Sequence, residues 1–569
     1  MSFFIESFMS DNKLLSFIGI SFSLACLVFV RAFRYLLYPS VNGYYEYAIP
    51  KLEFVSLSVC ILIVTAVFVL MLIGLEFIKH PVLKTLLQIL FLIAGLACFT
   101  GMNSEILNWL IEGRPQAVNY ELPLAIFGIA LLAAIKRKFS LENLVRAFQS
   151  IALVFVFYGL FLVVQSVYVV AGFGGYNYSP QILEKPSIKS SINTRVVWLI
   201  FDELEYATLI NRPKQFPMPA FDRLSAESFV ADKAYPPNFW TQQSLPSLLF
   251  GRITLTTEPT SPRELNLTFL NGDPPKSLSD NQNIFARVKA LGGATGVEGW
   301  LHPYPRLFQE SLDRGYWVGS QVVRCDAVLN CMPELFADAF ESFPMPNPFR
   351  ANKRTDEGGR LNKDRFMEGQ IKRAPSILER AVELTADERL NFVFIHFSIP
   401  HARFVDRKLN PSDEGYFDSL QAVDESLKEV RGAMEVKGLW DTTTVIVSGD
   451  HWWRFKTNEY LSYLPEKTRS EVMEDQRVPF IVKLAEHSDK FVYPTQFNTV
   501  ATSDIVVGLL SGNLKTGRDL ASRIDELRTE RPIEMNHIPK REQIAEDVFE
   551  RNSGGITADP AWTPRDEGP

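Results

Sequence analysis

The stretch VVWLIFDELEY, residues 196–206, decides how this chain of 569 residues is interpreted. Its apolar run ends at two adjacent carboxylates, Asp202 and Glu203. A short apolar run is typical of a buried parallel strand, and ligands of open α/β sheets bind beyond the carboxyl ends of such strands. Two carboxylates at that edge favour a divalent metal, because burial makes an uncompensated charge costly. The alternative is a helix N-terminus that carries acidic residues.

Two later stretches repeat this pattern of an apolar strand that ends in polar side chains. NFVFIHFSIPH carries His396 and His401, and TTTVIVSGDHWWR ends its strand at Asp450 and His451. A single histidine is more often structural than a ligand, but Asp-His directly after a strand places both side chains where the strand leaves the core. Carboxylate and imidazole together suit zinc or a similar first-row metal better than calcium.

A hydroxyl residue stands between these strands in the sequence. NFWTQQSLPSLLFGR places Thr241 at or near the start of a predicted helix. Backbone N–H groups and the positive end of the helix dipole favour a bound anion there, so Thr241 could act as a metal-activated nucleophile. The alternative is that Thr241 or Ser244 only caps the helix.

The first part of the chain predicts a membrane domain. Most of its apolar segments approach the roughly 20 residues that cross a bilayer. We expect about five spans, at 14–30, 54–75, 86–102, 122–135 and 151–173. With the N-terminus inside, more Lys and Arg residues fall in the inner loops, including the KRK cluster at 136–138, although Arg31 and Arg34 favour the opposite orientation.

This pattern divides the chain into a transmembrane helical domain (residues 1–173), a Gly- and polar-rich linker (174–193), a soluble α/β domain (194–515) and a charged, partly disordered tail (516–569). An odd number of spans places everything after residue 173 outside the cytoplasmic membrane. No ionisable pair stands out within the spans, which favours an anchor over a transporter. The net charge of −7 without a basic block argues against nucleic acid as a partner.

The five cysteines divide in the same way. Cys26, Cys60 and Cys98 lie in apolar runs and are expected to be packing residues. Cys325 and Cys331 lie in the polar half, where a local disulfide would form if that half is outside the cytoplasm. Spacing alone leaves this disulfide open.

Together these motifs resemble the sulfatase branch of the alkaline phosphatase superfamily over residues 195–512. VVWLIFDEL resembles the first metal-binding strand, TQQSLPSLLFGR the nucleophile helix, IHFSIPH the paired-histidine strand and VIVSGDHWWR the distal metal motif. RVPFIVKL and TSDIVVGLLSG resemble the strand and the helix that follow. The resemblance implies an α/β domain with a central mixed, mostly parallel sheet. Five spans ahead of it resemble the lipoteichoic acid synthases and the phosphoglycerol and phosphoethanolamine transferases.

The resemblance also implies the site residues. Carried over position by position, the metal ligands are Asp202 or Glu203, Thr241, Asp450 and His451, with Thr241 as the nucleophile. Transferase members have one acid at the Glu203 position, whereas hydrolytic sulfatases use both, so one or two ions remain open. Zinc is favoured, with Mn, Mg or Ca as alternatives. The Cys-x-Pro-x-Arg sequence of formylglycine sulfatases is absent at Thr241.

The remaining site residues are candidates for substrate contact. His401 corresponds to the family histidine that contacts the transferred group or protonates the leaving oxygen, and His396 is a second candidate. Arg454 is placed to meet a phosphate. Trp452 and Trp453 stand where the family has a small residue, and they either narrow the site, stack on a sugar or pack.

These observations predict a multi-pass inner-membrane transferase with its catalytic domain on the periplasmic or extracellular side. It would move a phospho-alcohol head group from a membrane phospholipid, through Thr241, to a hydroxyl of a surface glycan or lipid. A phosphodiester or sulfate ester hydrolase shares the first step and is the alternative. An inactive binding module is a third reading. The HPYPR stretch around His302 receives no role.

Overall fold

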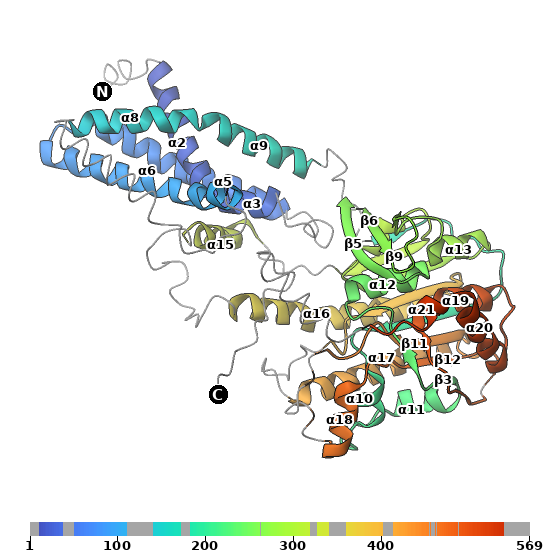
Figure 1. The fold of residues 1–569 in the computed structure, drawn as a ribbon. Helices are drawn as coiled ribbons and strands as arrows, with labels where there is room; N and C mark the ends of the chain where they lie inside the picture. The colour runs from blue at the N-terminus through green and yellow to red at the C-terminus, as the bar shows by residue number, and fades with distance from the viewer. Residues whose placement is uncertain are drawn as a thin grey trace. The chain divides into compact units, whose positions relative to one another are not determined.

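The fold is taken from a computed structural model, and the chain forms two compact units that are described separately. The described residues are 11–37, 51–110, 140–171, 182–261, 263–318, 327–340, 360–401, 413–454, 456, 461, 464–487 and 489–539. The first unit holds the N-terminal helices together with one helix from later in the chain (Figure 1). The second unit holds the α/β domain.

The first unit, called the helical unit here, is entirely helical in its described part. Its helices are α2 (Asp11–Val28), α3 (Val30–Leu37), α5 (Lys51–Phe77), α6 (Pro81–Leu110), α8 (Leu141–Val154), α9 (Val156–Val170) and α15 (Val328–Phe340). Within the described residues, three stretches are long and apolar enough to cross a membrane: Lys51–Phe77, Pro81–Cys98 and Leu141–Val170.

These stretches agree with three of the five predicted spans, and the last one begins ten residues earlier than predicted. The apolar part of α2, Lys13–Val28, is shorter than these three. The predicted span at 122–135 lies outside the described residues. The expected number of about five spans is therefore not confirmed.

Contacts between the helices establish their relative directions. Lys13 Nζ lies 2.8 Å from a carboxylate oxygen of Glu76, so α2 begins where α5 ends. Lys84 Nζ lies 3.6 Å from Glu142, so α6 and α8 begin close together. Gly19 of α2 lies against Val156 at the start of α9, and Gly159 of α9 lies against Cys26 further along α2, so these two helices are parallel.

The second unit is built on a nine-stranded mixed sheet of order β1-β9-β8-β10-β2-β11-β12-β3-β13. In that order the strands are Ile182–Glu184, Arg314–Val318, Thr295–Trp300, Phe392–Phe397, Val196–Phe201, Thr444–Gly449, Phe480–Lys483, Phe229–Ala231 and Phe491–Tyr493. The central strands β9, β8, β10, β2 and β11 are parallel neighbours. This sheet agrees with the prediction of a mixed, mostly parallel sheet.

Two smaller sheets accompany it. They are β4 (Ala234–Tyr235) with β14 (Phe497–Asn498), and β5 (Thr254–Ser261) with β6 (Glu264–Phe269) and β7 (Lys276–Ser277). The helices of this unit are α10 (Tyr206–Ile210), α11 (Pro219–Ala226), α12 (Thr241–Phe250), α13 (Ile284–Ala290), α14 (Tyr304–Leu307), α16 (Arg360–Thr385), α17 (Asp413–Val436), α18 (Glu466–Glu474), the 3-10 helix at Thr499–Ala501, α19 (Thr502–Leu510), α20 (Gly517–Glu530) and α21 (Pro532–Met535).

Helices cover both faces of the large sheet, because its central strands are buried along their whole length. On one face α12, α13, α19 and α20 pack around Trp198 and Phe394. On the other face α11, α16 and α17 pack around Leu199 and Ile395. The core reaches beyond residue 515, where the sequence suggested a charged tail, since Leu520 and Ile524 of α20 are fully buried in it.

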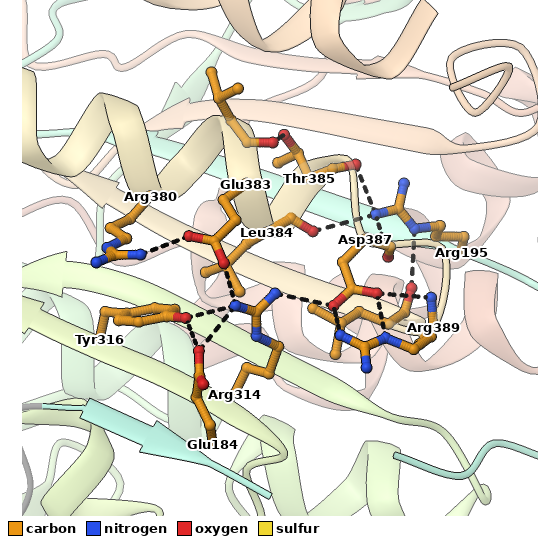
Figure 2. Close-up of polar contacts among 12 residues, drawn as sticks. Glu184, Arg195, Arg314, Tyr316, Arg380, Glu383, Leu384, Thr385, Asp387 and Arg389 are labelled. Carbon is orange, nitrogen blue, oxygen red and sulfur yellow. Dashed lines mark hydrogen bonds and ion pairs between the residues drawn. The ribbon is translucent and has the colours of Figure 1, made fainter. Parts of the chain in front are cut away.

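A network of ion pairs holds α16 to the amino edge of the sheet, the edge away from the candidate site (Figure 2). Arg314 at the start of β9 bonds Glu184 at 3.0 Å and Asp387 at 3.0 Å, and it also pairs with Glu383 at the end of α16. Arg195, just before β2, donates to the carbonyl of Thr385 at 2.8 Å. These contacts fix the base of the domain.

Candidate active site and metal centre

Four neighbouring parallel strands end at one edge of the sheet, and each delivers a polar residue there. Asp202 follows β2, His401 lies beyond β10, Asp450 follows β11, and His302 lies just beyond β8. The register pairs Phe201 with Gly449, so the ends of β2 and β11 are level. The sheet topology therefore gathers side chains that are up to 248 positions apart in sequence (Asp202 to Asp450).

Thr241 is the first residue of α12, and its side chain points into this edge rather than capping the helix. Its hydroxyl lies 3.4 Å from Asp202 Oδ1 and 3.0 Å from His451 Nε2, and the residue is 6% exposed. The residue before it, Trp240, is the N-cap and makes no side-chain cap bond. Ser244 Oγ donates to the carbonyl of Asp450 at 2.5 Å. The capping alternative for Thr241 and Ser244 therefore does not hold in the structure.

The carboxylates and imidazoles at this edge form a cluster with the chemistry of a metal site. His451 Nε2 lies 3.5 Å from Asp202 Oδ1 and 3.5 Å from Asp450 Oδ2. One ligand atom each from Asp202, His396 and Asp450 lie within 4.8 Å of one another. Among the described residues, Asp202 Oδ2, Asp450 Oδ2 and His396 Nε2 have no hydrogen-bond partner although all three are buried. Such buried atoms fit a divalent cation.

The electrostatics of the cluster point to the same conclusion. Burial, reinforced by Asp450 and Glu203, raises the pKa of Asp202 well above its usual value. Burial also raises the pKa of Asp450 to about 7. Burial lowers the pKa values of His396 and His451, which keeps both rings neutral with a lone pair to offer. Two crowded acids and two neutral imidazoles form a set that a divalent cation would stabilise.

Backbone contacts orient these ligands. Asp450 Oδ1 accepts from the backbone N–H groups of Glu203 at 3.0 Å and His451 at 2.8 Å. His451 Nδ1 lies 2.9 Å from the carbonyl of Trp452, so Nδ1 carries the hydrogen and the lone pair of Nε2 faces Thr241. His396 Nδ1 lies 3.2 Å from a carbonyl in the same way, which leaves its Nε2 turned to Asp202 at 4.0 Å.

The two adjacent acids have different surroundings. Glu203 adopts φ 62°, a left-handed backbone conformation. Arg454 Nε and Nη2 each lie 2.7 Å from Glu203 Oε1, and the guanidinium stacks on Trp240 at 4.2 Å. The sequence leaves open whether Asp202 or Glu203 is the metal ligand. The geometry favours Asp202. Glu203 is the counter-ion of Arg454.

The histidines also divide differently from the prediction. His396, expected as a substrate contact, lies with the metal-type cluster and has its Nδ1 3.0 Å from the hydroxyl of Tyr304. His401 is 7% exposed and meets Trp300 edge-on, with ring centroids 5.9 Å apart. Its expected contact with a transferred group remains a prediction.

His302 is a site residue to which the sequence assigned no role. Its ring lies in hydrogen-bonding contact with the backbone of Thr241 and Gln242, and burial lowers its pKa to about 4. Arg306, one turn later, is 3% exposed and stacks on Trp317 at 4.4 Å. The sequence does contain a signal for His302. TGVEGWLH forms a further short buried strand, and a histidine follows it.

The two tryptophans after His451 are packing residues. Trp452 is fully buried, and its ring centroid lies 6.4 Å from that of Phe239. Trp453 stacks on Tyr416 at 4.0 Å, and the Tyr416 hydroxyl donates to the carbonyl of Glu203 at 2.7 Å. These indoles support the turns that carry the acids and present no face for a sugar.

Comparisons with known proteins can now be set beside this geometry. A family model described as Sulfatase matches residues 194–511, which is more than half of the chain. A search of curated proteins gave no match. Among solved structures, the sulfatase PsFucS1 from Pseudoalteromonas sp. is 15% identical, covering 56% of this chain and 68% of that chain, with a TM-score of 0.35.

Murine ectonucleotide pyrophosphatase / phosphodiesterase 5 is 12% identical, covering 58% of this chain and 99% of that chain, with a TM-score of 0.32. The assignment rests on the family match rather than on these distant likenesses. Together with the strand-end cluster, the match answers the question of family. The chain belongs to the Sulfatase family.

Proposed function

We propose that this protein is a membrane-anchored, metal-dependent transferase that works through a covalent ester on Thr241. The observation that carries the proposal is the position of the Thr241 hydroxyl, 3.4 Å from Asp202 Oδ1 and 3.0 Å from His451 Nε2 in a buried cluster. A hydroxyl held between a carboxylate and an imidazole lone pair is suited to nucleophilic attack. An inactive binding module would have no use for this arrangement.

Asp202, Asp450 and His451 would hold the metal, with His396 able to complete the set. A bound divalent ion would supply Lewis acidity and lower the pKa of the hydroxyl. Zinc suits a set of carboxylate and imidazole ligands, and Mn, Mg and Ca remain alternatives.

The chain's own residues would carry the first step as follows. Thr241 Oγ attacks the phosphorus of a phosphodiester, the new O–P bond forms, and the bond to the leaving alkoxide breaks. The hydroxyl proton moves toward Asp202 Oδ1, since the Nε2 lone pair of His451 would be used by the metal, and His401 is the candidate that protonates the leaving oxygen. His302, against the backbone of Thr241, would hold the start of α12 in place.

The apolar helices favour a lipid donor. A catalytic domain attached to three membrane-length helices would be held beside phospholipid head groups, where the donor is concentrated. The acceptor would then be a hydroxyl of a surface glycan or lipid. A hydrolase, which delivers the same ester to water, is supported equally by the family.

The test is mass spectrometry of the peptide that contains Thr241, after the full-length protein has been incubated with native membrane lipids. We expect an added phospho-alcohol mass that is absent from Thr241→Ala. Absence of the adduct, together with full activity of Thr241→Ala, would contradict the covalent route. Release of the head group into ¹⁸O-labelled water without any acceptor would favour the hydrolase.

A further inference from the structure

Helix α15 lies in the helical unit, although the chain places it inside the sulfatase domain. It falls between β9, which ends at Val318, and α16, which begins at Arg360. It nevertheless groups with the N-terminal helices, and it packs against α3 and α5 (Figure 1). The sulfatase chain therefore returns to the helical unit after it has first left through α9.

Helix α15 packs closely against its neighbours in the helical unit. Cys331 and Leu335, one turn apart, are 1% and 3% exposed. Phe336 meets Phe29, at the junction of α2 and α3, edge-on with ring centroids 5.4 Å apart. Cys331 is disulfide-bonded, while Cys325, its expected partner, lies outside the described residues. The buried stripe and the contact with Phe29 give this helix a defined place in the unit.

The level of this contact along the helices is also defined. α3 directly follows α2, so it lies at the end of the bundle opposite the Lys13–Glu76 ion pair. Since α9 runs parallel to α2, it ends at that same level. α15 therefore docks where the chain leaves the bundle for the sulfatase domain, and not midway along the spans.

The outer flank of α15 has the pattern of a helix at a membrane surface. Leu329 is 75% exposed, and Val328 and Met332 beside it are partly exposed. Polar residues recur every fourth position of the sequence, at 330, 334 and 338. At 13 residues the helix is too short to cross a bilayer. On α5, against which α15 packs, Val55 is also exposed, at 51%.

We propose that α15 is an interfacial helix that attaches the sulfatase chain to the bilayer a second time. Its buried stripe docks on α3 and α5, and its Leu329 flank contacts lipid at the boundary of head groups and acyl chains. The proposal rests on the membrane location proposed for the helical unit. With α15 at the bilayer, the sulfatase chain would meet the membrane at two separate places in its sequence.

The test introduces a photoreactive benzoylphenylalanine at single positions of the full-length protein in native membranes. Position Leu329 is examined beside Leu62, on the middle of α5 and 69% exposed, and Val436, at the end of α17 and 86% exposed. All three side chains are exposed in the structure, so the label should not disturb folding. We expect lipid adducts at 329 and 62 and none at 436.

The three positions distinguish failure of the interfacial role of α15 from failure of the proposed membrane location. A lipid adduct at 62 without one at 329 would overturn the interfacial role of α15 while leaving the membrane location intact. An adduct at 329 to protein in place of lipid would overturn it as well. Absence of lipid at both 62 and 329 would overturn the membrane location and, with it, this proposal.

Discussion

At the scale of single residues, the two adjacent acids Asp202 and Glu203 show how one turn assigns two roles. Asp202 lies with Thr241 and His451, whereas Glu203 pairs with Arg454 at 2.7 Å. The backbone of Glu203 is left-handed, with φ 62°. A buried arginine without this counter-ion would be costly, so we expect Glu203 to hold Arg454 in place.

This division predicts different metal contents for two matched substitutions. Asp202→Asn removes a ligand charge, and we expect most of the bound divalent ion to be lost. Glu203→Gln should keep the ion yet lower activity roughly 10- to 100-fold, because Arg454 loses its anchor. Metal analysis of the purified variants is the measurement. Equal loss of metal from both would contradict the assignment and restore Glu203 as a ligand.

His302 predicts a pH dependence of stability. Its pKa is about 4 in the folded protein against a usual 6.5, because burial disfavours the charged ring. The unfolded chain then binds more protons between these values, so stability is complete above pH 6.5 and falls as the pH drops towards 4. The loss is up to roughly 3 kcal/mol for this group.

Thermal melting between pH 4 and 8 measures this effect. In His302→Gln the melting temperature should fall less steeply between pH 6.5 and 4 than in the unchanged protein. His537, whose pKa is lowered less, provides the comparison variant His537→Gln. Identical slopes for the unchanged protein and His302→Gln would show that another group dominates the acid loss.

At the scale of elements, the site depends on how closely β2 and β11 approach each other at their ends. A Cβ added to Gly449 would lie 2.4 Å from the carbonyl oxygen of Leu204, in the turn that carries Asp202 and Glu203. Only glycine leaves room for that backbone. The residue before the Asp-His pair therefore supports the metal-type cluster without touching it.

Gly449→Ala should therefore displace the turn, destabilise the protein by about 1–3 kcal/mol and weaken metal binding. Gly432→Ala is the matched control, since nothing lies within 4 Å of an added Cβ there and α17 is helical. The control should be neutral or stabilising by up to about 1 kcal/mol. Denaturant titration with metal analysis compares them. Normal metal binding by Gly449→Ala would contradict this prediction and show that the turn accommodates the added methyl group.

At the scale of the whole molecule, the chain's path through the helical unit predicts its orientation. α2 begins, α5 ends, and α6 and α8 begin at one end of the bundle, as the pairs Lys13–Glu76 and Lys84–Glu142 show. α9 ends at the other end and leads to the sulfatase domain. If the helices span a membrane, these two ends face opposite compartments.

Single cysteines and a membrane-impermeant thiol reagent measure this orientation in intact cells. Val436→Cys, exposed on the sulfatase domain, should be labelled directly. His80→Cys, exposed between α5 and α6, should be labelled only after the membrane is opened. Cys26, Cys60 and Cys98 are buried in the helices and provide a low background. The reverse pattern would place the catalytic domain in the cytoplasm.

Much of this protein follows from its sequence, because strand patterns and strand-end residues are local. Apolar runs that end at Asp202, His396 and Asp450 indicate the parallel strands, and uninterrupted apolar stretches indicate the membrane-length helices. The family motif adds Thr241. His302 was missed because its strand ends in one histidine, which by itself is a weak signal.

Only the tertiary structure decided which of these side chains meet. The order of strands in the sheet brings His302 to the backbone of Thr241, and the fold brings Arg454 to Glu203. The return of α15 to the helical unit has no local signal either, since it depends on packing between segments that are hundreds of residues apart. Local periodicity determines the elements, whereas long-range packing determines their partners.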